Sequence, residues 1–465
     1  MSEIYSYTVP HSGVNTTYYF EDTDLRNRIS DAEAYVGYTD SDIAGLEVDY
    51  ENNTFTRLAG AVGKSGGSDF NVFPTYASMR RCILADDGTV VAYYGDSGYV
   101  EDGSAGQVMV EIPKFYYKVV PMKLQKQTKE DSYDTNRMGY HILKARYYIS
   151  ATPKTGFKIH PLFVVNGNEI NYVYMSAYEG CVYDVSANEY LLNDEQTIDY
   201  TASTGDKLSS ISGAQPCSGR DSNNELTISG CRQLAANRGA GWYQQTVEAV
   251  CAIYLLFIVE YGNCNIRNTI GMGVSNITDT LSYNCSSFVG STSSLGNTTG
   301  RASATVDYTG TEQTDTDKTS ISYRGIENFY SNIFKWVDGV NIYGDGTNAG
   351  GQPYVCNNMS FADQQIVDNY IPVGFTLTHT SGYIKYFGYG KAKYDWLFMV
   401  SDVGGNSSAP VGGAYFNSYN LHTYGSCIFG GSWSFYDANG YSWGLSANQV
   451  DRKSRSVSAR LMYLT

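Results

Sequence analysis

The chain has 465 residues with 42% apolar and 17% charged side chains, so it can bury at least one full core and is not a disordered or supercharged protein. Its net charge of −15 and sequence pI near 4.8 argue against nucleic acid as the main partner, because phosphate backbones are bound by basic faces. The start, MSEIYSYTVP, predicts no export leader, and the longest apolar run (250–259) is too short to span a bilayer. We therefore expect no membrane insertion.

The N-terminal part predicts short strands separated by turns. Residues 1–62 alternate runs such as YSYTVP and LEVDY with polar turns, and GAVGKSGG (60–67) predicts a flexible joint. Residues 63–106 carry turn signals such as Asp-Asp-Gly, and residues 108–120 (VMVEIPKFYYKVV) predict one strand. Because that strand contains proline, we expect it at the edge or the start of a sheet.

Two helices are predicted near the middle of the chain. Ser229 can cap a helix over residues 230–237, which Gly239 would end in a left-handed turn. The second helix lies in TVEAVCAIYLLFIVEYG, with Thr246 at its start and Glu248 near the positive end of its dipole. Its faces are apolar almost all round, which predicts a central, buried helix.

The C-terminal half begins with a polar, Ser/Thr/Asn/Gly-rich segment, residues 262–320, which predicts either an elaborate surface excursion or a partly mobile stretch. Strand-like sequence resumes at residues 323–343. The closing SVSARLMYL alternates as a strand does, so we expect the C-terminus to be held inside a sheet.

Motifs for enzyme chemistry are weak. Gly-Lys-Ser at 63–65 lacks the glycine that a phosphate-binding loop needs, since Leu58 occupies that position. Five scattered histidines and nine scattered cysteines show no catalytic or metal-ligand spacing, and we interpret the cysteines as buried apolar residues. The Asp-rich turns at 86–103 could hold calcium, although ordinary turn chemistry explains them better.

The strongest signal is an aromatic, loop-like stretch near the end. Six of the fifteen residues from Phe429 to Trp443 are aromatic, and small polar residues separate them. Rings set among Ser, Gly and Asn are typical of binding loops. Burying every polar residue of the stretch would be costly, so we expect some rings to point inward and others outward.

Several segments resemble one family in their order along the chain. YRGIENFYSNIFKWVDGV (323–340), the segment GWYQQTVEAVCAIYLLFIVEYG (241–262) and the Gly430-Gly431-Ser432-Trp433 to Arg460-Leu461 tail resemble the formylglycine-generating-enzyme type of C-type-lectin fold. The phasing of Ala438, Tyr441 and Trp443, together with the blocks at 79–120 and 174–185, resembles phage and prophage tail proteins with this fold, including variable proteins of diversity-generating retroelements.

The resemblance implies an α+β fold with three parts. These are a β-rich N-terminal attachment or oligomerisation region (1–62), a β-rich lead-in (63–106) and a C-type-lectin-like receptor-binding domain (107–465) with a polar insertion at about 262–320. In such tails some residues pack the fold and others face a receptor. The packing role falls on Trp433, Ala438 and Trp443, and Phe429 and Tyr441 share their phase. The residues expected to face a receptor are Tyr415, Phe416, Asn417, Tyr419, His422, Ser426, Cys427, Ser432, Ser434, Phe435, Asp437, Ser442 and Gly444.

The function that the resemblance implies is attachment of a virion to a bacterial surface glycan or protein. We expect a homotrimer in the phage tail, folded in the host cytoplasm and bound to other tail or baseplate proteins. The copper-dependent enzymes of this fold carry a cysteine pair in the C-terminal part. Only Cys427 stands there, so we expect no catalysis and no cofactor. Two alternatives stay open: a structural baseplate component, and a glycan-degrading tailspike.

Overall fold

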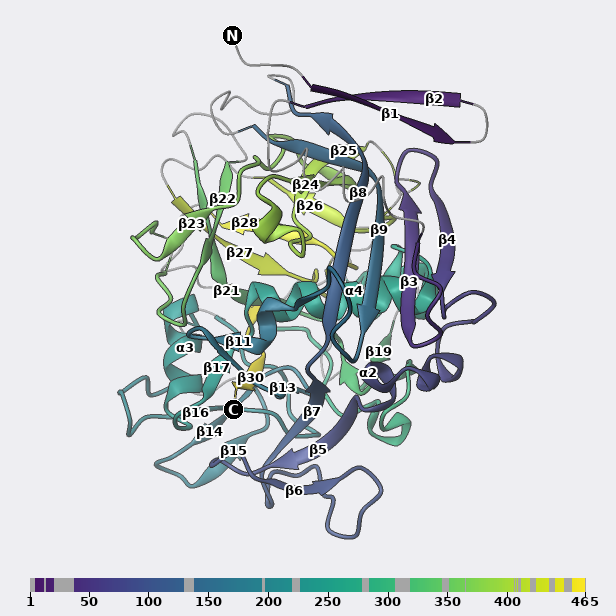
Figure 1. Cartoon of the computed structure of the whole chain (residues 1–465). Coiled ribbons are helices and arrows are strands. Elements are labelled where there is room, and N and C mark those ends of the chain that lie inside the picture. Colours follow the sequence, from purple (N-terminus) through teal and green to yellow (C-terminus); the bar gives the residue numbers. More distant parts are fainter. Residues whose placement is uncertain are drawn as a thin grey trace.

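The computed structural model is mostly β-sheet with few helices (Figure 1). It describes residues 5–11, 14–20, 37–128, 138–194, 197–219, 226–277, 284–305, 318–344, 351–363, 365–404, 406, 408, 411–418, 424–434, 440–446 and 454–464. The helices are α2 (Pro74–Ala77), α3 (Ile228–Ala236), α4 (Val247–Tyr261) and α5 (Ile266–Ile270), with short 3₁₀ turns η1 (Ser68–Val72), η2 (Pro161–Phe163), η3 (Ser293–Leu295) and η5 (Ala392–Tyr394).

One large sheet holds the C-terminal strands. Its spatial order is β10 (Lys158–Ile159), β8 (Tyr116–Lys126), β9 (Tyr140–Ser150), β24 (Gly382–Tyr389), β26 (Tyr415–Asn417), β28 (Trp443–Ser446), β27 (Tyr424–Phe429), β21 (Phe334–Tyr343), β22 (Gln352–Cys356) and β23 (Tyr370–Pro372). Flanking this path, β3 (Ile43–Asp49) pairs with β9, β4 (Thr54–Ala59) with β3, β25 (Val400–Gly404) with β24, and β29 (Val457–Ser458) with β21.

A second sheet contains the end of the chain. Its order is β17 (Trp242–Gln244), β30 (Leu461–Leu464), β13 (Tyr172–Ser176), β7 (Gln107–Pro113), β5 (Arg80–Leu84) and β6 (Val90–Tyr93). Because β30 lies between β17 and β13, the prediction that a sheet holds the C-terminus is confirmed.

Small sheets complete the described strands. They are β1 (Tyr5–His11) with β2 (Val14–Phe20); β11 (Val164–Val165) with β12 (Asn168–Glu169); β15 (Glu189–Leu191), β14 (Cys181–Asp184) and β16 (Lys207–Ser209); and β18 (Gly300–Ser303), β19 (Thr319–Tyr323) and β20 (Ile326–Glu327).

Residues 108–120 form two strands rather than one. β7 ends at Pro113 and β8 starts at Tyr116, so the chain passes here from the second sheet to the large sheet. β7 is not an edge strand, because β13 and β5 pair with its two sides. The missing N–H of proline is tolerated because Pro113 is the last residue of its strand.

Helix α4 is the centre of the core, as its all-round apolar sequence predicts. Of its 15 residues, 13 are buried, and it packs against β3, β9 and β21 (Figure 1). Gly262 ends it in the left-handed conformation with φ of 60°. Thr246 stands at the expected cap position, but its side chain makes no capping hydrogen bond. Helix α3 starts earlier than predicted, since the Thr227 hydroxyl, not Ser229, accepts the N–H of Gly230.

Strand pairing joins the three predicted segments. β3 pairs with β9 and β5 with β7, so residues 43–59 and 80–93 belong to the same sheets as the later chain. The stretch predicted as a flexible joint is anchored, because the Gly67 N–H donates to Glu260 at 3.0 Å and its carbonyl accepts from Arg324 at 3.1 Å. The attachment role of residues 1–62 stays a prediction.

The polar segment 262–320 contributes to the core where it is described. Val274, Ile277 and Cys285 form a buried cluster with Ile333 and Trp433. The interpretation as a surface excursion is therefore wrong for Val274, Ile277 and Cys285. These residues pack against Trp433, which the sequence predicts to be a packing residue. Residues 278–283 and 306–317 lie outside the described part of the chain.

The nine cysteines are all free and buried, which confirms their interpretation as apolar core residues.

Candidate functional site

The four framework rings, Phe429, Trp433, Tyr441 and Trp443, are all buried. The Tyr441 ring stacks on Tyr254 of α4, with ring centroids 3.6 Å apart and planes 19° apart. Its hydroxyl donates to the Phe398 carbonyl at 3.1 Å. The framework therefore fixes the C-terminal segment to the central helix, as the phasing of these rings predicts. Ala438 lies outside the described residues.

The Gly430-Gly431 turn fits against the segment 328–332. Gly430 and Gly431 have φ of 103° and 82°, a backbone conformation that favours glycine. The Gly430 carbonyl accepts the Ser331 N–H at 2.6 Å, and the Trp433 N–H donates to the Asn332 carbonyl at 2.8 Å. The turn and this segment are thus joined by backbone hydrogen bonds.

Two buried cations hold the segment 327–331 in place. The Arg460 guanidinium donates to the carbonyls of Glu327 and Asn328 at 2.6 and 3.0 Å. The Lys335 ammonium donates to the carbonyls of Asn328 and Ser331, both at 2.9 Å. Asn328 and Ser331, whose carbonyls accept these hydrogen bonds, have left-handed backbone conformations with φ of 46° and 73°. Arg460, at the Arg-Leu end of the C-terminal tail, therefore stabilises the fold.

Strand β26 shows which predicted receptor residues point outward. Tyr415 and Asn417 are half-buried, whereas Phe416 between them is fully buried, as the alternation of a strand requires. Tyr415 faces Tyr383 of β24 in register, with ring centroids 5.3 Å apart. Tyr383, Tyr415 and Asn417 are named here the contact surface; their strands lie side by side in Figure 1.

Several predicted receptor residues lie in the interior instead. Strand β27 is an interior strand between β21 and β28, and both Ser426 and Cys427 on it are fully buried. Ser432 is buried, and the Ser442 hydroxyl accepts the Tyr415 N–H at 2.8 Å. A Cβ at Gly444 would lie 2.9 Å from Ile428. The prediction of receptor contact is therefore wrong for six residues that are packed in the interior: Phe416, Ser426, Cys427, Ser432, Ser442 and Gly444.

The remaining predicted positions are divided. Ser434 is exposed, and Gly440 lies close to Ala414, next to Tyr415. Tyr419, His422, Phe435 and Asp437 lie outside the described residues, so their receptor contact stays a prediction.

Tyr383 is the residue that sequence reasoning missed. The run GYIKYFGY (382–389) alternates between buried and half-buried side chains along its first half, with Tyr383 and Lys385 outward. This two-residue period was the available signal. Lys385 pairs with Asp402 of β25 at 3.3 Å on the same side of β24.

The Asp-rich turns show ordinary turn hydrogen bonding. Asp96 accepts the Tyr93 N–H, Asp102 accepts the Ser104 N–H, and Asp86 pairs with Arg238. In the part of the chain that the structure describes, no three His, Cys, Asp or Glu side chains are grouped to hold a metal ion. None of the described helices is both long and apolar enough to cross a membrane.

Comparison with known proteins yields little. No family model matches the chain, and no curated protein matches it. A solved structure, "Major Tropism Determinant I1 Variant", is similar over 86% of this chain and 72% of its own, with 11% sequence identity and a TM-score of 0.26. A superposition this loose supports neither a fold assignment nor a function.

Proposed function

We propose that this protein is a phage tail receptor-binding protein with a C-type-lectin-like C-terminal domain. It would attach the virion to a bacterial surface glycan or protein through the contact surface and make or break no bond. The observation that carries this proposal is the division of the C-terminal rings. Phe429, Trp433, Tyr441 and Trp443 pack inward, while Tyr415 emerges beside Tyr383 on neighbouring strands.

The chemistry of the contact surface suits recognition. Tyrosine rings provide contact area at low entropic cost, and a hydroxyl on each ring can donate or accept a hydrogen bond. Two such rings at 5.3 Å, with Asn417 on the same face of β26, form a surface for stacking a sugar ring or a flat side chain. Tyr419, His422, Phe435 and Asp437 would contribute to the same receptor contact in this proposal.

The rigid backing also supports the proposal. Tyr415 is held by the Ser442 hydroxyl and by the neighbouring strands β24 and β28, so the ring is positioned before any partner arrives. Preorganisation of this kind lowers the entropic cost of binding. We propose that the protein is a homotrimer in the virion, so that several weak sites act together by avidity.

The test is binding of the fluorescently labelled full chain to a panel of intact bacterial cells and purified envelope glycans. On the strain that binds the chain, we expect Tyr383→Ala and Tyr415→Ala each to lower the affinity about tenfold. Tyr172→Ala is the matched control, since this exposed tyrosine lies in the other sheet. Equal binding by all three folded variants would reject the contact surface. Release of reducing ends from the glycans would favour the tailspike alternative.

A further inference from the structure

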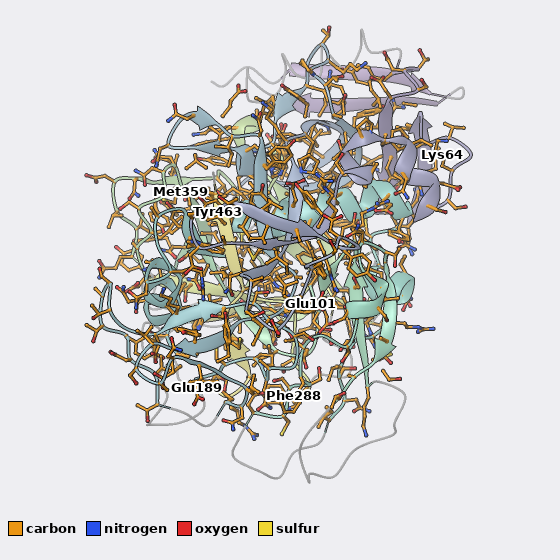
Figure 2. All side chains as sticks on the ribbon, turned by 90° about the horizontal axis from the view of Figure 1, so that it is seen from below. Lys64, Glu101, Glu189, Phe288, Met359 and Tyr463 are labelled. Atoms are coloured by element: carbon orange, nitrogen blue, oxygen red, sulfur yellow. The ribbon has the colours of Figure 1, made fainter. Side chains whose placement is uncertain are left out.

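A cavity of about 240 Å³ lies away from the contact surface. It is enclosed by η2 and β11, the first turn of α4, the end of β22, η5 and the end of β30. Figure 2 labels Met359, one of its wall residues. The apolar walls include Leu162, Val355, Met359, Phe361, Trp396 and Met462. A concave site with mostly apolar walls and few polar groups is the usual form of a small-molecule site.

One carboxyl group lines this cavity. Glu248 is partly buried on the first turn of α4, and no ion pair joins it to any described residue. Burial, with a smaller contribution from the nearby carboxylate of Asp338, raises the pKa of Glu248 to about 7, although a hydrogen bond with the Thr246 side chain opposes the shift. The cavity therefore contains an acceptor whose charge no described protein cation balances.

A phenol also lines the cavity. Tyr394 is only 5% exposed, and its hydroxyl has no hydrogen-bond partner among the described residues. Burial raises the pKa of Tyr394 to about 12, and the charge of Glu248 contributes. A buried hydroxyl without a partner is unfavourable, so a ligand that hydrogen-bonds it gains affinity.

The charges around the cavity favour a cation. Asp338 lies close enough to affect Glu248, and the nearby Arg232 is held by Asp338 and Asp363 at 2.7 Å each. Lys393 is exposed at the cavity rim, with its ammonium 5.5 Å from the centre of the Tyr394 ring. The thiol of Cys356 also faces the cavity and is neutral, because burial raises its pKa to about 11.

We propose that this cavity binds a small organic cation, a primary ammonium group carried on an apolar or aromatic body. The ammonium would donate to the Glu248 carboxylate and to the Tyr394 hydroxyl oxygen, and the body would pack against Trp396 and Phe361. An ammonium group has donors and no acceptor, which matches the two oxygens, and aromatic walls attract cations. This site is separate from the contact surface and does not depend on the proposed function.

Calorimetry with three matched probes tests the proposal on the full chain. Phenethylamine, 2-phenylethanol and 3-phenylpropionate share a phenyl body and differ in the charge of the end group. We expect phenethylamine to bind at least about tenfold more tightly than 2-phenylethanol, and 3-phenylpropionate not to bind, because a hydrogen bond to a charged group is stronger than a neutral one. Equal binding of the amine and the alcohol would overturn the proposal, as would no binding of the amine.

Variants locate the site. Glu248→Gln should lower the affinity for phenethylamine about tenfold. Tyr394→Phe should lower this affinity by a smaller factor, since the phenol supplies a neutral acceptor. The control Lys393→Ala should bind as well as the native chain or better, because a like charge is removed from the rim. Unfolding midpoints check that each variant folds. If Glu248→Gln does not fold, the pH dependence decides: amine binding to the native chain should tighten from pH 6 to 8 as Glu248 ionises. Binding that stays constant with pH would overturn the proposal.

Discussion

Lys335 and Glu179 form an ion pair inside the protein, with Nζ 2.6 Å from Oε1 and both side chains fully buried. They come from two segments, 323–340 and 174–185, that lie far apart in the sequence. Burial lowers the pKa of Lys335 to about 8, and Glu179 opposes this shift. Lys335 and Arg460 also donate to the carbonyls of Glu327, Asn328 and Ser331, within the segment that hydrogen-bonds the Gly430-Gly431 turn. The interior charges thus position the C-terminal segment.

Removing one member of this pair should be strongly destabilising. Lys335→Met leaves the Glu179 charge and the carbonyls of Asn328 and Ser331 buried without their partner, so we expect a loss of about 3–5 kcal/mol in the free energy of unfolding. Denaturant titration measures it. Lys385→Met is the control, because its pair with Asp402 is exposed and contributes less than about 1 kcal/mol. Equal effects of the two variants would contradict the structural role of Lys335.

The raised pKa of Glu248 predicts a dependence of stability on pH. Its folded pKa of about 7 lies above its ordinary value of 4.5, so the folded state binds more protons between these values. This contribution is complete below about pH 4.5 and is lost as pH rises through 7, about 3 kcal/mol in all. Unfolding measured from pH 4.5 to 8 should show a decline in the native chain that is reduced in Glu248→Gln. Parallel curves for the two proteins would show that the carboxyl is not desolvated.

The framework ring Tyr441 should matter far more than the exposed Ser434. Tyr441→Ala empties the space against Tyr254 and should cost about 3–5 kcal/mol. Tyr441→Phe keeps the ring and loses the hydrogen bonds of its hydroxyl with the Phe398 carbonyl and the Cys251 thiol, about 1–2 kcal/mol in all. Ser434→Ala should leave the unfolding midpoint unchanged. If Tyr441→Ala leaves the free energy of unfolding unchanged, the C-terminal segment is not fixed to α4.

Thiol labelling should separate Cys356 from the rest. Cys356 lines the cavity and is 6% exposed, while burial raises its pKa to about 11. A thiol reagent should therefore label this site first and slowly, because little thiolate forms at neutral pH. Mass spectrometry identifies the labelled residue, and unfolding should expose all nine cysteines. Phenethylamine should slow the labelling of Cys356. Faster labelling of Cys427 would contradict its burial in β27.

Some of this structure could be predicted from the sequence and some could not. The central position of α4 follows from its all-round apolar sequence, which is a local property, whereas the inward framework rings are expected from the resemblance of the tail. The burial of Ser426 and Cys427 depends on β21 and β28 pairing with both sides of β27, a long-range arrangement that no local pattern shows. The break at Pro113 and the meeting of Glu179 with Lys335 also arise from pairing between distant segments.

The proposal that the contact surface meets a receptor is tested most directly by oxidative footprinting of the full chain, free and bound to the bacterial strain or envelope glycan that retains it. Tyr383 and Tyr415 should lose reactivity on binding, while Tyr172 in the second sheet should keep it. Protection of Tyr172 with unchanged Tyr383 and Tyr415 would contradict the account and place the interface elsewhere.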